Sequence, residues 1–193
     1  GVEQWNQTYG GSSNEYGKSV QQTTDGGYII CGVTESFGNG NKDVYLIKTD
    51  NNGIEQWNQT FGGVTNKAAR SVEQTTDGGY IFTGWNVNDG LWLVKTDENG
   101  VEQWFKTFGG SYAKGYSVTQ TTDGGYIVCG QIESIIFYDG PDVYLIKTDE
   151  NGVEQWSKTF GGTSYDKGYS VEQTTDGGYI ITGETRSFSN NKE

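Results

Sequence analysis

The sequence predicts an all-β protein, a β-propeller of four repeats with four antiparallel strands each. Two landmarks recur along its 193 residues and support this fold. Thr-Thr-Asp-Gly-Gly-Tyr-Ile occurs four times, starting at Thr23, Thr75, Thr121 and Thr174. Gly-(Val/Ile)-Glu-Gln-Trp also occurs four times, starting at Gly1, Gly53, Gly100 and Gly152, so the repeats are 52, 47 and 52 residues long. Units of this length stack on one another, because none of them buries its apolar face alone.

Each repeat is expected to begin with a hairpin, whose strands we name A and B. In the first complete repeat, A covers residues 19–24 and B covers residues 28–33. Both runs are rich in residues that favour strands, and Asp25-Gly26-Gly27 separates them. Asp-Gly between two such runs is a strong hairpin signal.

Strands C and D follow a loop whose sequence varies between the repeats. C is predicted at residues 43–49, where apolar and polar residues alternate, and D at residues 54–61. Asp50-Asn51-Asn52-Gly53 lies between them, and Gly supplies the left-handed conformation that a tight turn needs at its end. No segment of the repeat has the 3.6-residue period of a helix.

Four-stranded units of about 50 residues are typical of propeller blades, and four to eight blades close a ring. We therefore expect one domain over residues 1–193. Its parts are an outer strand at 1–9, blades at 10–61, 62–108 and 109–160, and a partial blade at 161–193.

The last repeat lacks its C strand. The outer strand predicted at Val2–Tyr9 is a D strand, and it would run parallel to the last B strand if it took the place of C. An unpaired edge therefore remains, and exposed edges invite pairing with another chain. Either the sequence is a segment of a longer array, which the absence of Met favours, or a strand from a partner completes the last blade.

Composition disfavours several classes of function. The net charge is −12 and there is no histidine, which disfavours binding to nucleic acid or anionic lipid. Without histidine, a Ser-His-Asp triad, a Cys-His pair and a His-based metal site are absent. No apolar run has the length of a membrane helix, so no membrane insertion is expected. Cys31 and Cys129 occupy equivalent positions in non-adjacent repeats, which predicts two separate buried thiols.

The recurring acids are expected to shape turns. Asp25, Asp77, Asp123 and Asp176 precede Gly-Gly, whereas Asp50, Asp97 and Asp149 open the C–D turn. Side-chain to backbone hydrogen bonds explain both sets. The further ligands of a calcium loop are missing, so neither a metal nor another cofactor is expected. Fourfold copying also argues against a unique pair of catalytic carboxylates.

Binding groups are expected on the face that carries the variable B–C and D–A connections, since loops on a rigid scaffold commonly bind ligands. The candidate residues are apolar or aromatic: Trp85, Trp92, Tyr112, Ile135, Ile136, Phe137 and Tyr138. The four consecutive residues 135–138 either fold over a blade or bind a subunit or ligand. The aromatic residues either pack between blades or stack on sugar rings. Asn6 and Asn58 lie in Asn-x-Thr triplets and are candidate glycosylation sites, conditional on export.

The repeat resembles the kelch type. The residues of this resemblance are a Gly at the end of B, namely Gly32, Gly84, Gly130 and Gly183, and a Trp on D, namely Trp5, Trp57, Trp104 and Trp156. B ends in a single Gly rather than the family's pair. The whole chain is also similar to the Asp-Gly-Gly-Tyr-Ile repeats of large secreted or surface-attached prokaryotic proteins. The resemblance implies a propeller with A at the centre, D at the rim and Trp between blades, and an extracellular or cell-surface location.

These observations predict a non-enzymatic scaffold that binds a protein partner or self-associates through its loop face and its open strand edges. The alternative is a carbohydrate-binding module that uses Trp85, Tyr112 and Phe137. A glycosidase-like enzyme is the third hypothesis.

Overall fold

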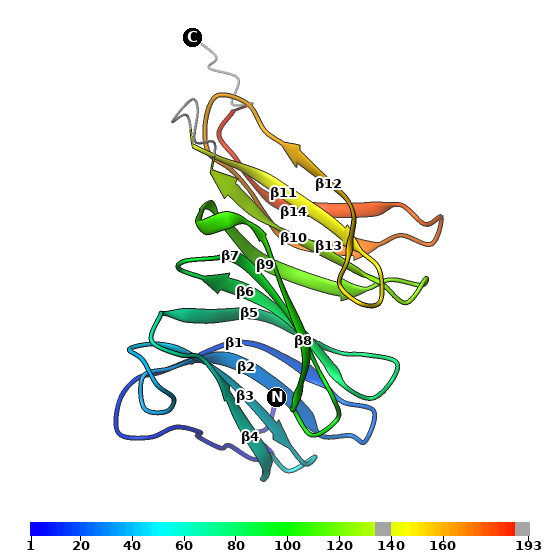
Figure 1. Ribbon diagram of the computed structural model, residues 1–193. Helices are drawn as coiled ribbons and strands as arrows, with labels where there is room; N and C mark the ends of the chain where they lie inside the picture. Colours follow the sequence, from blue (N-terminus) through cyan, green and yellow to red (C-terminus); the bar gives the residue numbers. More distant parts are fainter. Residues whose placement is uncertain (134–139, 188–193) are drawn as a thin grey trace. The chain divides into compact units, whose positions relative to one another are not determined.

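The computed structural model describes residues 1–133 and 140–187, and within them the protein is all-β, with one short 3-10 helix, η1 (Gly110–Tyr112) (Figure 1). The first seven strands are β1 (Glu15–Gln22), β2 (Tyr28–Thr34), β3 (Asp43–Thr49), β4 (Glu55–Phe61), β5 (Lys67–Gln74), β6 (Tyr80–Asn86) and β7 (Gly90–Thr96). The other seven described strands are β8 (Glu102–Gly109), β9 (Ala113–Gln120), β10 (Tyr126–Glu133), β11 (Pro141–Thr148), β12 (Glu154–Phe160), β13 (Asp166–Gln173) and β14 (Tyr179–Thr185).

The described strands form four sheets, and each sheet consists of strands that are consecutive in the sequence. Three sheets have four strands, β1-β2-β3-β4, β5-β6-β7-β8 and β9-β10-β11-β12, and the fourth pairs β13 with β14. The strands of the first, third and fourth sheets pair antiparallel. The predicted succession of A, B, C and D strands is thereby confirmed, and C of the first repeat has the predicted bounds.

The hairpin turns form as the sequence predicts. In the first A–B turn, the Thr23 N–H donates to the Gly27 carbonyl at 2.9 Å, and Gly26 has a φ of 85°. In the first C–D turn, the Asp50 N–H donates to the Ile54 carbonyl at 2.9 Å, and Gly53 has a φ of 76°. Both glycines therefore adopt the left-handed region that other residues avoid.

The chain divides into two compact units, which we describe separately. Unit 1 comprises Gly1–Phe82 and Val94–Trp104, and unit 2 comprises Thr83–Leu93 and Phe105–Glu193. Strands β6, β7 and β8 contribute residues to both units.

In unit 1, strand β5 packs against β1, β2 and β3. Ile29, Cys31 and Ala69 are fully buried there. The side chain of Gln21 on β1 accepts a hydrogen bond from the Gln74 N–H on β5 at 2.6 Å. The A strand of one repeat therefore lies against the A and B strands of the repeat before it.

In unit 2, strand β13 packs against β9, β10 and β11 in the same way. The core between them contains Ile127, Cys129, Leu145 and Val171. The Ser117 hydroxyl on β9 accepts a hydrogen bond from the Val171 N–H on β13 at 3.3 Å. Each unit therefore contains one interface of the same kind between successive repeats.

The two cysteines are separate buried thiols, as predicted. Cys31 in unit 1 and Cys129 in unit 2 are both unexposed and not disulfide-bonded. Burial raises the pKa of each thiol to about 12, because the apolar surroundings disfavour the thiolate.

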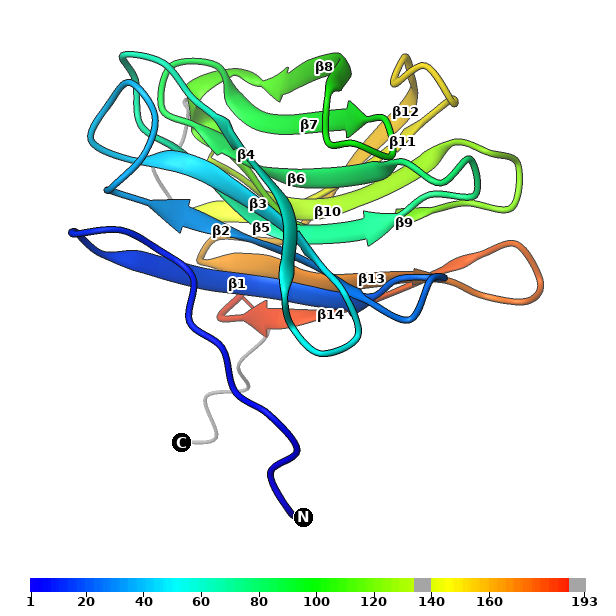
Figure 2. The ribbon, with the colours of Figure 1, turned by 90° about the horizontal axis from the view of Figure 1, so that it is seen from below.

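The prediction of a strand at Val2–Tyr9 is wrong. These residues form no strand, and Figure 2 shows the chain before β1 as an irregular segment. A D strand needs a C strand beside it, and no described strand pairs with this segment. Its side chains nevertheless pack, since the Trp5 and Tyr28 rings lie 5.7 Å apart and the Tyr9 hydroxyl donates to the Gly53 carbonyl at 2.6 Å.

Three tryptophans of the repeated Gly-(Val/Ile)-Glu-Gln-Trp motif pack against a tyrosine of the following repeat. The ring pairs, all with centroids 5.7 to 5.8 Å apart, are Trp5 with Tyr28, Trp57 with Tyr80, and Trp156 with Tyr179. In each pair, the Trp of one repeat lies against the first residue of the next B strand.

Candidate functional site

A buried lysine joins three elements of the first sheet. The Lys48 Nζ on β3 donates to the Asp25 carboxylate at 2.8 Å, to the Thr49 carbonyl at 2.8 Å and to the Gln56 side chain at 3.0 Å. The Lys48 side chain is 5 % exposed, whereas that of Asp25 is 54 % exposed. An ammonium group has three donors, and all three are used. We call this arrangement the lysine clip; it joins the A–B turn to strands C and D.

The clip recurs wherever a C strand is present in the described residues. The second clip consists of Lys95 with Asp77, Thr96 and Gln103. The third clip consists of Lys147 with Asp123, Thr148 and Gln155. The glycine after each turn leaves room for the carbonyl that the lysine binds. A Cβ on Gly27 would lie 2.1 Å from the Thr49 oxygen, and a Cβ on Gly125 would lie 2.1 Å from the Thr148 oxygen.

The clips lower the pKa of their carboxyl groups. The Asp25 carboxyl has a pKa of about 2, chiefly because it accepts hydrogen bonds from Lys48 and Thr23. For Asp123, hydrogen bonds from Thr121 and Lys147 lower the pKa to about 2. For Asp77, desolvation acts most strongly and raises the pKa, but hydrogen bonds led by that from Lys95 outweigh it, and the pKa is again about 2.

Acid is expected to weaken the fold through these three carboxyls. Their ordinary pKa of 3.8 falls to about 2 on folding, so the unfolded chain binds their protons first. Their contribution to the free energy of unfolding is complete above about pH 5 and disappears as the pH falls through 4 towards 2. Urea unfolding followed by Trp fluorescence should show a lower midpoint at pH 2.5 than at pH 6. Equal midpoints would contradict this assignment, and Asp123→Asn should reduce the difference.

The clips have the chemistry of structural ion pairs. Each ammonium is neutralised by a carboxylate and enclosed by further acceptors, so neither group is poised as an acid, a base or a nucleophile. Among residues 1–133 and 140–187, no cluster of three or more His, Cys, Asp or Glu side chains could hold a metal ion.

The fourth repeat has the same turn without a lysine. The Asp176 carboxylate accepts from the Thr174 hydroxyl and, at 3.2 Å, from the Gly178 N–H, as its counterparts do. These hydrogen bonds, that from Thr174 first, lower its pKa. No lysine among the described residues contacts Asp176. A Cβ on Gly178 would meet only its own turn, at 3.0 Å from the Thr174 hydroxyl.

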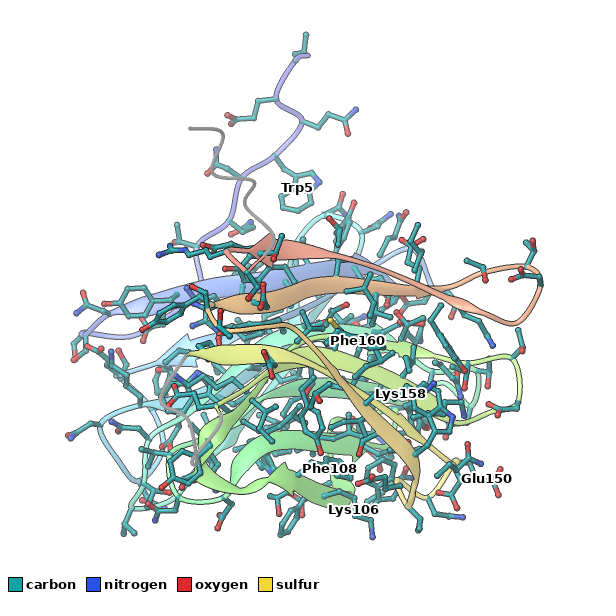
Figure 3. The ribbon with its side chains drawn as sticks, turned by 90° about the horizontal axis from the view of Figure 1, so that it is seen from above. Trp5, Lys106, Phe108, Glu150, Lys158 and Phe160 are labelled. Atoms are coloured by element: carbon teal, nitrogen blue, oxygen red, sulfur yellow. The ribbon has the colours of Figure 1, made fainter. Side chains whose placement is uncertain are left out.

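A groove lies beside β14 in unit 2. It has a volume of about 450 Å³, and its apolar lining includes Val143, Phe160, Tyr179 and Ile181. Phe160 is at the end of β12 (Figure 3) and is 47 % exposed. Its counterpart in the first repeat, Phe61, is 8 % exposed and lies 5.0 Å from the Phe82 ring. The edge of β14 with this groove is the candidate functional site of the described chain.

The aromatic residues singled out from the sequence lie in different environments. Trp92 is on β7, only 3 % exposed, and its ring packs edge-on against Phe105 at 6.4 Å. Trp85 is on β6 and half-buried. Tyr112 is in η1 and 49 % exposed. Of these three, Tyr112 is exposed and Trp85 is half-buried, whereas Trp92 is buried.

Two further sets of predicted residues have different outcomes. Ile135, Ile136, Phe137 and Tyr138 lie outside the described residues. Asn6 and Asn58 are exposed, and the side-chain amide of each donates to a glutamate three residues earlier at 2.6 Å. Glycosylation of Asn6 and Asn58 stays a prediction.

The lysine clip was not predicted from the sequence, although a signal exists. Lys48, Lys95 and Lys147 each follow four consecutive apolar or aromatic residues in strands that are largely buried on both faces. A lysine in a strand buried on both faces requires a partner, because an isolated buried charge is costly. The Asp of the A–B turn, which its local sequence indicates only as a turn residue, is that partner.

Within the described part of the chain, no helix is both long and apolar enough to cross a bilayer. No family model matches the sequence, and no curated protein matches it. Among solved structures, the chain is similar to a protein of unknown function from Bacteroides caccae, whose crystal structure was determined at 1.35 Å. The TM-score is 0.57 and the identity 13 %, over 88 % of this chain and 54 % of that one. The chain thus spans about half the length of that protein, and at this identity the similarity concerns the fold alone.

Proposed function

We propose that this chain is part of a kelch-like β-propeller and that it is a non-enzymatic scaffold that binds protein, including further copies of itself. The interface repeated in both units supports the propeller, because each unit lays an A strand against the A and B strands of the preceding repeat. The tryptophan contacts between repeats support the kelch-like order. The similarity of the repeats to those of surface-attached proteins supports an extracellular or cell-surface location.

The exposed apolar faces support binding most directly. Ile180 on β14 is 61 % exposed, whereas its counterparts Ile29, Ile81 and Ile127 are fully buried. Large apolar side chains gathered on exposed faces are typical of interaction surfaces.

The first sheet has an exposed apolar face as well. On β1, Val20 is 63 % exposed, and it shares this face with Gly17, since Val20 lies opposite Ile30 and Gly17 lies opposite Gly32. A Cβ on Gly17 would meet nothing within 4 Å, whereas a Cβ on its counterpart Gly168 would lie 2.2 Å from the Cys129 sulfur. Inside each unit, the A strand of one repeat packs against the A and B strands of the repeat before it. The exposed face of β1 corresponds to the first of these two surfaces, and the exposed face of β14 corresponds to the second. Head-to-tail association of two copies would bury both.

Light scattering coupled to gel filtration tests this function. We expect a mass above 21.2 kDa that rises with concentration, since a head-to-tail contact leaves one face free on each end. Ile180→Lys should return the mass to that of one chain, because a charge would be buried in the contact. Val64→Lys is the matched control, since Val64 is 94 % exposed. A mass of one chain at all concentrations would contradict self-association.

A further inference from the structure

Strand β14 has an open edge that its counterparts lack. Strand β2 pairs with β1 and β3, and β10 pairs with β9 and β11, whereas β14 pairs with β13 alone among the described strands. An unpaired edge presents a row of backbone donors and acceptors to an incoming strand. Adding a strand to such an edge is a common way to bind an extended peptide.

The counterparts define the register of an incoming strand. Tyr28 lies opposite Thr49, Ile29 opposite Lys48, and Gly32 opposite Tyr45. The third sheet repeats this register with Tyr126 opposite Thr148 and Gly130 opposite Tyr144. By the same register, an antiparallel strand on β14 would place a threonine opposite Tyr179, a lysine opposite Ile180 and a tyrosine opposite Gly183.

Asp176 provides a specific partner for that lysine. The carboxylates at its three counterparts each bind the lysine of a C strand at 2.8 to 2.9 Å. Asp176 is held in the same turn by Thr174 and Gly178. Residues opposite each other in a strand pair point to the same face. The tyrosine and isoleucine of the incoming strand would therefore lie on the face of Tyr179, Ile181 and Gly183, which line the groove.

We propose that the edge of β14 binds an extended peptide segment with the pattern Asp-Val-Tyr-Leu-Ile-Lys-Thr, antiparallel to β14 and with its lysine on Asp176. An intact second copy cannot supply it, because β3, β7 and β11 are each paired on both edges. The occupant is therefore none of the described strands of this chain. This proposal rests on the proposed function and deepens it by naming the partner of one strand edge, that of β14.

Surface plasmon resonance tests the proposal. The chain is immobilised sparsely, so that copies do not meet, and the probe is a peptide with the sequence of residues 142–148. We expect saturable binding that weakens at least about tenfold when the peptide lysine becomes norleucine, which keeps the apolar stem and removes the charge. Asp176→Asn in the protein should weaken the original peptide equally and leave the norleucine peptide unaffected. Glu172→Gln, an exposed charge change on β13, is the control and should have no effect.

Amide hydrogen exchange locates the peptide. Protection should appear on β14 and not on β12, an edge strand of the third sheet. Absence of saturable binding, equal affinity of the norleucine peptide, or protection confined to β12 would each overturn the proposal. A mass of one chain in the light-scattering experiment would refute self-association but would not affect the measurement of peptide binding. Failure of the proposed function and failure of this proposal are therefore distinguishable.

Discussion

Replacement of Lys48 by methionine is expected to lower the free energy of unfolding by about 3 kcal/mol. Methionine keeps much of the apolar stem but donates no hydrogen bond. The carbonyl of the buried Thr49 would then lose its donor inside the sheet, which is the larger part of the cost. The exposed Gln56 side chain would exchange the lysine for water. The Asp25 carboxylate is half-exposed, so water replaces the lysine there at small cost. Urea unfolding at pH 7, followed by Trp fluorescence, measures the change.

Two variants control this experiment. Lys18→Met removes an exposed lysine from β1 and should change stability by less than about 0.5 kcal/mol. Asp25→Asn keeps the lysine and its other acceptors, so its effect should lie between those of Lys18→Met and Lys48→Met. A Lys48→Met protein as stable as the Lys18→Met protein would show that the clip does not stabilise the fold.

Gly32→Ala is expected to destabilise the protein by more than about 3 kcal/mol. Gly32 on β2 lies opposite Gly17, where the register of the β1–β2 pair shifts. A Cβ on Gly32 would lie 2.2 Å from the backbone oxygen of Tyr16, so the two strands would have to separate. The same clash recurs in unit 2, where a Cβ on Gly130 would lie 1.9 Å from the Lys114 oxygen. Thermal unfolding by circular dichroism measures the change.

Gly17→Ala is the matched control on the facing strand. A Cβ there meets nothing within 4 Å, and no positive φ is required. We expect a change within about 0.5 kcal/mol, or a slight gain because alanine has fewer unfolded conformations to lose. If the two variants were equally stable, close approach of β1 and β2 would not be the reason for glycine at the end of B.

Much of the fold follows from local sequence. The turns at Asp25-Gly26-Gly27 and at Asp50 to Gly53 are specified by their own residues. The alternation predicted for residues 43–49 is wrong, because β3 is buried along its whole length. Strand pairing is not local, and this explains the error at Val2–Tyr9. That segment has the residues of a D strand but no C strand beside it, and strands form only where backbone groups find partners.

The site was less predictable because it depends on contacts between distant residues. The Asp25 carboxylate makes its local turn contacts and also binds Lys48, 23 residues away, which turn chemistry alone does not indicate. Trp92 follows a variable connection, as expected of a binding residue, yet neighbouring packing buries it. In contrast, the open edge at the last repeat could be predicted from counting strands, because three C strands serve four repeats.

The two thiols report separately on the stability of the two units of the chain. Cys31 belongs to unit 1 and Cys129 to unit 2, and both are inert while buried because their thiolates are disfavoured. Alkylation at either sulfur therefore requires local opening of the unit that holds it. Adding an alkylating reagent under native conditions and mapping the modified peptides would measure the rate of local opening of each unit separately. No engineered label is needed.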